Sequence, residues 1–560
     1  MLRIRYEFGN FMKTFELASA ARKFALILRC SIFGLILSVG ACGNENHAGK
    51  TSSGVNSEAK SRTLRRGLPG EPKTLDPHLA DDTYSLQVVR DLYEGLTALN
   101  RDGSVVAGIA GSWSVDETGT RYTFSIRPGA KWSNGDPITA YEFVAGLQLA
   151  VSPKSSSGSA SMLSVIQNAE EIIAGKKPVS ALGVTAIDRS TVAVALNRPA
   201  PYILQILAEP VAAPLHLKPK SSSGTADLVV TDGPYRLGKR AFGAYIELER
   251  NKEYWNADQV RIEHVRYVDF ESQSTELRSY LAKDLDLTYT VPTPDLARVE
   301  LFHGSELQTA PILGTLYLAL DLTETPLQNN RDLRQALSMA VDRDVIAQHL
   351  SLHVAPAYSF VANGIAEYTP PAYAWGSWPR DRQIDVAREL FKRAHPGAEP
   401  LHLTMYFNGG EGIERIMVSI ADAWKKNLGI ETALVSDEFR VFLAQKSDRK
   451  KWDVVRLGWW ADYNDPSSFL EIFSANSSSN DSGYVSAEFN RLIEGARTES
   501  IPVKRMDLLQ KSEATLLADY PIIPIYFYAA AHLVSPEIRG AQISPLNRTY
   551  SKHLAWAEPP

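Results

Sequence analysis

The pattern of apolar and polar positions switches between strand-like and helix-like stretches along most of the chain. Residues 121–126 and 245–250 alternate apolar and polar side chains and run into turn residues, which is typical of half-buried strands. Residues 332–349 place their apolar side chains on one helical stripe behind an acidic start, and a second helical window covers about 412–427. The pattern predicts a mixed α/β fold.

Two extended apolar runs, 315–322 and 522–534, bracket the two best helical windows. Runs of this kind suit buried strands. If both cross between the same two lobes, the segment between them forms a lobe on a two-stranded hinge, and a ligand can be enclosed between the lobes. The alternative is that they are two unrelated core strands, and the pattern alone leaves both readings open.

The N-terminal region predicts export and a lipid anchor. Basic residues precede an apolar run from Cys30 to Ala41 that is too short to span a membrane. The run closes on residues 39–43, which resemble the lipobox of bacterial lipoproteins, and this resemblance makes Cys42 the lipidated residue. We therefore expect a signal peptide over 1–41 and a flexible polar tether over 42–61. A simple secretory cleavage site and a start at Met12 remain alternatives.

Composition limits the classes of partner. The chain has 560 residues, 44% hydrophobic and 22% charged, which is enough for two or three globular domains. Its formal net charge of -5 gives no basic surplus for nucleic acid. Cys30 and Cys42 are the two cysteines of the sequence, so the exported protein can form no internal disulfide. Its stability must come from burial.

One carboxylate, Asp462, stands among large aromatic residues, with Arg456 just upstream; the aromatics are Trp459, Trp460 and Tyr463. A carboxylate with aromatic neighbours loses hydration, so it favours a cationic partner such as a ligand ammonium group. The competing interpretation is a loop carboxylate that caps the turn at residues 464–466.

Motifs of catalysis are absent from the sequence. It has no zinc helix of the HExxH type, no GxSxG elbow, and no phosphate or dinucleotide loop. His349 and His353 have the spacing of two metal ligands, but no third ligand or general base is evident, so two surface histidines at a helix end are the simpler reading. We expect neither a cofactor nor a metal site.

The order of several motifs resembles the oligopeptide-binding proteins of ABC importers, in the extracytoplasmic peptide/nickel solute-binding family. The segments that carry the likeness are 71–77, 91–96, 130–137, 248–255 and 458–464. The resemblance implies a three-domain Venus-flytrap architecture with a periplasmic-binding-protein-like fold, in which two hinge strands join two lobes. The implied boundaries are 62–90, 210–315 and 525–560 for domain I, 91–209 for domain II and 316–524 for domain III.

The resemblance also implies roles for individual residues. The aspartate at the Asp462 position pairs with the α-ammonium group of a peptide, and the arginine at Arg456 lies near the carboxylate end of longer ligands. The tryptophan at Trp459 lines a side-chain pocket. Glu71 and Tyr528 are placed against the peptide backbone.

Three positions depart from the pattern of the oligopeptide binders. Trp460 stands where a relative has a small cysteine, Ser159 stands where a tyrosine is expected, and Ile413 replaces an expected histidine. The ammonium anchor is retained while the pocket is reshaped. Ligand class is therefore better preserved than ligand length or side-chain preference.

The resulting hypothesis is a monomeric, lipid-anchored extracytoplasmic receptor that captures short peptides and delivers them to an ABC permease without performing chemistry. Other cargo, such as a cell-wall peptide, a nickel chelate, haem or an amino-sugar compound, is an alternative in the same class. A peptide-acting enzyme and a chaperone-like surface lipoprotein are alternatives from other classes. Gly43 lacks the aspartate that retains many lipoproteins at the inner membrane, so the membrane that carries the anchor stays open.

Overall fold

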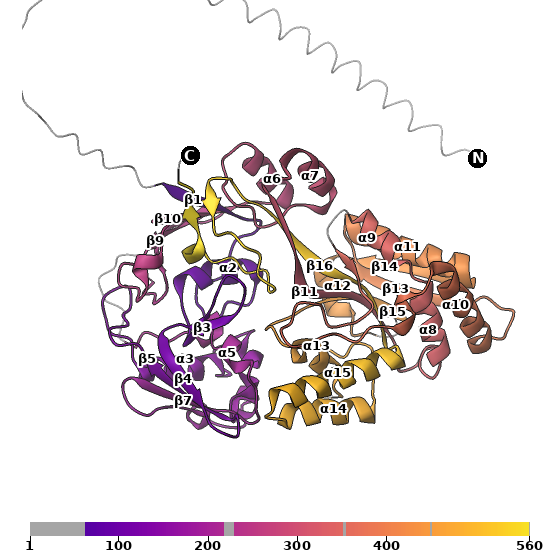
Figure 1. Cartoon of the computed structure of the whole chain (residues 1–560), viewed down its shortest axis with the longest axis horizontal. Coiled ribbons are helices and arrows are strands. Elements are labelled where there is room, and N and C mark those ends of the chain that lie inside the picture. The colour runs from indigo at the N-terminus through magenta and orange to yellow at the C-terminus, as the bar shows by residue number, and fades with distance from the viewer. Residues whose placement is uncertain (1–61, 218–228, 351–353, 449–450, 476, 559–560) are drawn as a thin grey trace, which may run out of the picture. The chain divides into compact units, whose positions relative to one another are not determined.

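The computed structural model describes residues 62–217, 229–350, 354–448, 451–475 and 477–558 (Figure 1). The predicted signal peptide, Cys42, the tether and His353 lie outside these ranges.

A four-stranded sheet forms near the start of the described chain, in the order β1-β10-β9-β8. Its strands are β1 (Thr63–Leu68), β10 (His264–Asp269), β9 (Tyr245–Arg250) and β8 (Tyr235–Ala241). Alternate residues of β9 are buried, which confirms the strand predicted over 245–250. Helix α2 (Thr83–Leu92) packs on this core, and Asp82 caps it by accepting from the Tyr84 and Ser85 amides.

A second four-stranded sheet has the order β4-β5-β7-β6 and its own hydrophobic core. Its strands are β4 (Ala110–Val115), β5 (Arg121–Ile126), β7 (Thr191–Ala195) and β6 (Val184–Ala186). The prediction over 121–126 coincides with β5, where Tyr122 and Phe124 point into the core. Helix α3 (Ala140–Ala150) packs on the same core and begins with a capping box between Thr139 and Glu142.

The largest sheet has six strands in the order β12-β16-β11-β15-β13-β14. They are β12 (Ala355–Pro356), β16 (Ile522–Leu533), β11 (Leu307–Leu320), β15 (Val454–Trp460), β13 (His402–Asn408) and β14 (Glu431–Asp437). A separate hydrophobic core covers each face of this sheet.

The other α-helices and the short strands lie between and after these sheets in the chain. The helices are α4 (Ala169–Ile173), α5 (Ile203–Ile206), α6 (Gln273–Leu281), α7 (Leu296–His303), α8 (Arg331–Ala340), α9 (Arg343–His349), α10 (Arg380–Ala394), α11 (Glu411–Leu428), α12 (Phe439–Gln445), α13 (Ser467–Leu470), α14 (Ala487–Thr498) and α15 (Pro502–Asp519). The short strands are β2 (Thr97–Leu99), β3 (Val105–Ala107), β17 (Ile538–Arg539) and β18 (Ala555–Trp556). Helix α11 confirms the window predicted over 412–427.

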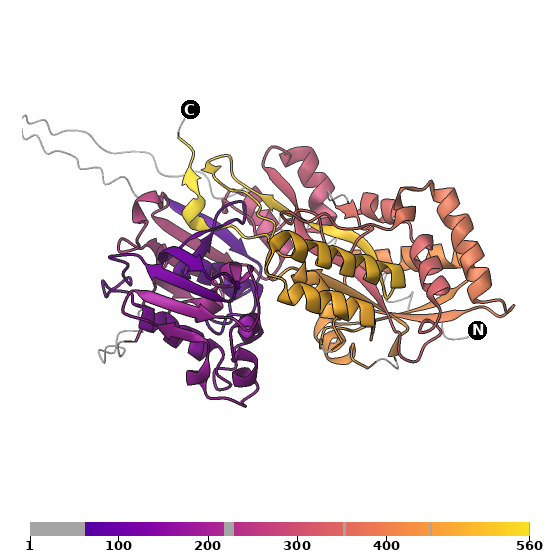
Figure 2. The same ribbon diagram turned by 60° about the horizontal axis from the view of Figure 1, so that its bottom comes forward.

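The two apolar runs that the sequence singles out lie in β11 and β16, which pair with each other in antiparallel register. Figures 1 and 2 both show them side by side. One end of the pair, around Leu307 and Leu533, packs in a small core with α6 and α7, and the other end lies in the six-stranded sheet. They are therefore not two unrelated core strands. The distribution of cores is compatible with the predicted domain boundaries, which stay a prediction.

The single helix predicted over 332–349 is wrong, because the chain forms two helices, α8 and α9, with an extended residue, Val341, between them. Asp342 caps α9 by accepting from the Val345 amide. The Ser338 carbonyl, which would continue the ladder of α8, instead accepts from the buried Arg343 guanidinium at 2.8 Å. A periodic apolar stripe continues across this break, so periodicity could not reveal it.

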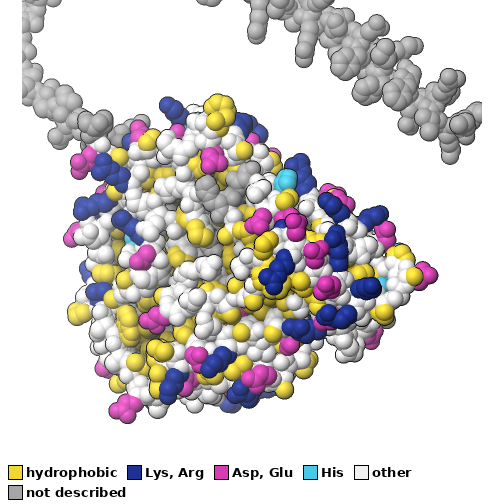
Figure 3. Space-filling model, turned by 45° about the vertical axis from the view of Figure 1, so that its right-hand side comes forward, with side chains coloured by type: hydrophobic (Ala, Val, Ile, Leu, Met, Phe, Trp, Pro, Cys, Tyr) yellow, Lys and Arg dark blue, Asp and Glu magenta, His cyan; other side chains and the backbone are white. Residues whose placement is uncertain are grey.

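Basic and acidic side chains intermingle on the face drawn in Figure 3. This distribution agrees with the small net charge of the sequence. Among the described residues, no helix combines the length and apolar character needed to cross a membrane.

We predict that Arg343→Met strongly destabilises the protein. Arg343 is 1% exposed and donates to the carbonyls of Ala357 and Pro524 as well as to Ser338. Methionine fills similar space but leaves these acceptors without a donor, which should cost about 3 kcal/mol. Urea denaturation followed by tryptophan fluorescence measures the effect.

The control is Arg491→Met, which removes an exposed guanidinium paired with Glu488. It should change stability by about 0.5 kcal/mol or less. Equal midpoints for the two variants would contradict the role given to Arg343.

Candidate functional site

Asp462 lies in the loop between β15 and α13, and the main chain on both sides of it is fixed by hydrogen bonds. The Ala461 amide donates to the Leu313 carbonyl at 2.9 Å, and the Asp462 amide donates to Ser468 Oγ at 2.9 Å. The Asp462 carbonyl accepts from Arg548 at 3.0 Å. The carboxylate itself is exposed and has no hydrogen-bond or ion-pair partner among the described residues.

Burial around the Asp462 carboxylate raises its pKa, and the negative charge of Glu209 adds to this effect while Arg548 opposes it. The side chain is solvent-accessible, so the raised pKa reflects the protein that surrounds the cavity rather than direct covering of the oxygens. The site thus contains an acid whose carboxylate has no ion-pair partner among the described residues, although Arg548 lies near enough to influence its pKa.

Asp465, three residues further on, shows the opposite arrangement. Its carboxylate is 4% exposed and accepts from Arg505 through both oxygens at 2.8 Å and from the Ser467 amide and hydroxyl. The turn-capping role that competed for Asp462 is therefore performed by Asp465. Within one loop, one carboxylate is fully paired and the other is left open.

Two cavities meet at Asp462 and Met162. The larger, of about 1130 Å³, lies between residues 161–206 on one side and residues 459–497 on the other. The smaller, of about 550 Å³, is lined on its apolar side by Ile312, Leu313 and Trp460 and on its charged side by Arg90, Glu209 and Arg548, among others.

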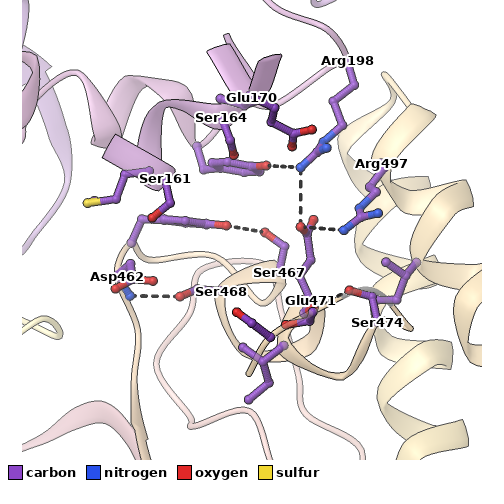
Figure 4. Close-up of a pocket in the computed structure, with 18 of the residues that line it drawn as sticks. Ser161, Ser164, Glu170, Arg198, Asp462, Ser467, Ser468, Glu471, Ser474 and Arg497 are labelled. Atoms are coloured by element: carbon purple, nitrogen blue, oxygen red, sulfur yellow. Dashed lines mark hydrogen bonds and ion pairs between the residues drawn. The ribbon is translucent and has the colours of Figure 1, made fainter. Parts of the chain in front are cut away.

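The larger cavity is rich in hydroxyl and charged groups (Figure 4). Glu471 accepts from Arg198 at 3.4 Å and from Arg497 at 3.0 Å, so one carboxylate joins two segments that are far apart in the sequence. In the figure Ser467 and Ser474 lie beside Glu471, whereas Ser468 lies beside Asp462; Ser161 and Ser164 also line this cavity. Such a lining suits hydrated polar groups.

The three aromatic residues beside Asp462 have different surroundings. Trp459 lines the larger cavity and donates from its indole nitrogen to the Ser468 carbonyl at 2.7 Å. Trp460 is 52% exposed and lines the smaller cavity. Tyr463 also lines the larger cavity, where its ring stacks on Tyr202 at 4.4 Å. The aromatics therefore divide between the two cavities rather than forming one wall.

Trp460 stacks on Tyr528, with ring centroids 4.5 Å apart. Two glycines make this contact possible: a Cβ at Gly458 would lie 2.7 Å from the Tyr528 hydroxyl, and one at Gly314 would lie 2.8 Å from the Trp460 ring. Burial raises the pKa of Tyr528, although the neighbouring Arg456 opposes the shift. Tyr528 is thereby held as a neutral hydroxyl between the two predicted site residues Trp460 and Arg456.

Arg456 is buried and donates to Asn408 Oδ1 at 2.8 Å and to the Tyr528 hydroxyl at 3.1 Å. Its Nε has no partner, and in the described part of the chain its hydrogen bonds go to an amide and a hydroxyl rather than to a carboxylate. It does not line either cavity at Asp462. A buried guanidinium that is bonded only to neutral groups still has capacity to bind an anion.

Glu71 is tied to its own sheet. Its carboxylate pairs with Arg240 at 2.6 Å and accepts from the Gly243 amide at 2.9 Å. Burial alone would raise the pKa of Glu71, but these hydrogen bonds leave it lowered. Glu71 is not among the residues that line the two cavities.

The three departures seen in the sequence have distinct surroundings. Trp460 covers part of the smaller cavity, and Ser159 lines the same cavity and donates to the Ala80 carbonyl at 3.2 Å. Ile413 packs against a core of the six-stranded sheet.

The sequence alone did not predict several residues of this site. Arg548 contacts the Asp462 carbonyl and pairs with Glu209, which also binds Arg90 at 3.0 Å. Gln205 contacts the loop from α5, and Tyr202 contacts it from the position just before α5. These residues lie far from Asp462 in the sequence and belong to no short motif, so no local signal could have identified them.

No group of three or more histidine, cysteine, aspartate or glutamate side chains in the described ranges could hold a metal ion. His349 bonds the Val345 carbonyl through its ring at 2.6 Å.

Comparisons with known proteins identify the family of the chain. Residues 104–481 match the model of the bacterial extracellular solute-binding proteins, family 5. The periplasmic oligopeptide-binding protein OppA of Salmonella typhimurium is 33% identical over 518 residues, covering 89% of this chain and 93% of that protein.

Two solved structures are similar over nearly their whole length. The unliganded open form of the murein tripeptide-binding protein MppA has a TM-score of 0.79 at 30% identity, covering 89% of this chain and 98% of the other. Haemophilus influenzae OppA in complex with RPPGFSPFR has a TM-score of 0.74 at 30% identity, covering 89% and 99%. The fold is thus that of periplasmic binding proteins, and with well over half of its residues inside the family model, the chain belongs to the bacterial extracellular solute-binding proteins of family 5.

Proposed function

We propose that this protein is an extracytoplasmic receptor that captures short peptides and delivers them to an ABC permease as a monomer, without performing chemistry. The main support is the Asp462 carboxylate, which lies where two cavities meet. It has no partner among the described residues, and its pKa is raised. An unpaired carboxylate in such a place favours a cationic group from a ligand. Relatives named for oligopeptide binding, and one solved with RPPGFSPFR, support a peptide as that ligand.

In this proposal the α-ammonium group of the peptide binds Asp462. Arg456 is a buried guanidinium without an acidic partner in the described chain, which suits the carboxylate end of a longer ligand. Trp460 and Tyr528 offer an aromatic surface beside the smaller cavity, and Trp459 a wall of the larger one. Glu71 is the weakest of the proposed contacts, because Arg240 already occupies its carboxylate.

The β11–β16 pair supports a hinge. Both strands run from the core around α6 and α7 into the six-stranded sheet, so bending of the pair would move one lobe against the other. We propose that peptide binding closes the lobes at this pair.

We further propose that Cys42 carries a lipid anchor and that residues 42–61 hold the receptor near its permease. At about 20 residues, such a tether reaches roughly 25 Å. The support is the lipobox-like sequence at 39–43.

Asp462→Asn should weaken binding of free-amine peptides by about 3 kcal/mol, or roughly a hundredfold in Kd, because the enclosed ammonium loses its counter-charge. Isothermal titration calorimetry with trialanine, pentaalanine and RPPGFSPFR measures this. Asp507→Asn, which removes an exposed acid paired with Lys511, is the control and should bind as the parent does. Unchanged affinity in Asp462→Asn would remove this residue from the site.

The pH dependence of binding should be bell-shaped. Binding needs ionised Asp462 and a protonated amine, so affinity falls as pH drops through the raised pKa of Asp462 and as pH rises through the peptide amine pKa near 8. The acid limb should therefore lie above the usual carboxyl range, and it should vanish in Asp462→Asn. Calorimetry from about pH 4 to about pH 9 tests this. An acid limb that persists in the variant would assign it to another group.

Cys42→Ser should release the protein from membranes, because the short apolar run of the N-terminus cannot span a bilayer. Fractionation of cells that lack the permease measures the change. A variant that stays with the membrane would refute the anchor.

A further inference from the structure

The structure assigns to Tyr202 and Gln205 a positioning role for Asp462, which rests on the proposed function and extends the binding site into the predicted domain II. We propose that these two residues hold the loop whose carboxylate receives the ligand ammonium. They would be positioning residues, since they act on the ligand only through Asp462.

The main chain of the loop determines where the Asp462 side chain points. Because its oxygens have no partner in the described chain, no side-chain bond fixes their direction. Their position follows from the main chain of the loop. The Ala461 amide is held by Leu313 of β11, and the Asp462 amide is held by Ser468 of α13.

The C-terminal half of the loop is held from the other side. The Asn464 amide donates to Gln205 Oε1 at 2.6 Å, and Gln205 Nε2 donates to the Asn464 carbonyl at 3.1 Å. One side-chain amide thus satisfies both polar groups of a single peptide residue, as a neighbouring strand would. This pair fixes the position and the direction of the backbone two residues after Asp462.

Tyr463, which lies between Asp462 and Asn464 in the chain, is fixed by packing. The rings of Tyr463 and Tyr202 are stacked, with 4.4 Å between their centroids and planes within 8° of each other. Tyr202 is 5% exposed and belongs to the core of the second sheet, so it offers a rigid surface. Asp462 is therefore followed by two residues that are both held by residues 202–205.

A third contact reaches Asp462 from the same segment through Arg548. This arginine donates to the Asp462 carbonyl and pairs with Glu209, which follows α5. Residues 202–209 consequently reach the loop at three successive residues. Two of these contacts hold the backbone of Asp462 and Asn464, and the third holds the ring of Tyr463 between them.

The test is calorimetry of Gln205→Ala with a free-amine peptide and with its N-acetylated form, using whichever of trialanine, pentaalanine or RPPGFSPFR binds the parent best. Loss of the two hydrogen bonds should weaken free-amine binding roughly tenfold. The N-acetylated peptide, which has no ammonium for Asp462, should bind the variant and the parent alike. The ratio of the two affinities should therefore shrink.

Matched variants separate positioning from general damage. Gln167→Ala removes an exposed glutamine of the same predicted domain that does not line the larger cavity, and this variant should keep the parental ratio of the two affinities. Tyr202→Phe keeps the stacking ring and should also keep the parental ratio of the two affinities. Tyr202→Leu removes the ring and should lower this ratio. Gln205→Glu keeps an oxygen that can accept from the Asn464 amide. Its second oxygen cannot donate to the Asn464 carbonyl, so this variant should not restore the parental ratio of the two affinities.

The outcomes are distinct. If Gln205→Ala leaves the ratio unchanged, or weakens both peptide forms equally, residues 202–205 do not position Asp462 and the inference is overturned. If the parent itself binds the two forms equally, the proposed recognition of the ammonium fails first. Melting temperatures of the unliganded variants verify that each one is folded.

Discussion

The β11–β16 pair is the contact on which the other arrangements of the site depend. Its register is interrupted between Pro311 and Thr315, where β11 has extra residues that β16 does not match. In this bulge Leu313 donates to the Pro545 carbonyl and accepts from the Ala461 amide. Ile312 and Leu313 also line the smaller cavity. The irregularity that weakens the strand pair therefore fixes the start of the Asp462 loop and shapes the cavity beside it.

The acidic residues around the loop differ in whether an arginine pairs with them. Asp465, Glu471 and Glu209 each bind at least one arginine, and these pairs join segments distant in the sequence. Asp462 stands among them without a partner in the described chain. Breaking a buried pair is strongly destabilising, so the paired acids are held in place, and the unpaired one keeps its capacity for an external cation. The difference lies in the surroundings, since all four residues are acids.

The sequence predicts the strands at 121–126 and 245–250, the helix near 412–427 and the two long apolar strands, because local periodicity determines each of them. It fails at 332–349, where the first helix ends at Ala340 and the Ser338 carbonyl accepts from Arg343, a buried side chain that also bonds to the distant carbonyls of Ala357 and Pro524. For the site, the motif around Asp462 identifies the loop. Gln205 and Arg548 could not be found, because they reach it only through the folded chain, and the bond between Glu71 and Arg240 was invisible for the same reason.

The contacts of the Asp462 loop link the proposed recognition of the ligand to the arrangement of the predicted domains. The loop of Asp462 is bonded on one side by Leu313 and Ser468 and on the other by Gln205 and, through Arg548, by Glu209. A group that must present an unpaired carboxylate cannot be fixed by bonds to that carboxylate. It has to be fixed through its backbone, and a short loop reaches enough partners only where several segments converge. Residues 202–209 and Arg548 therefore hold the backbone and the aromatic neighbour of Asp462 while its carboxylate stays without a partner in the described chain.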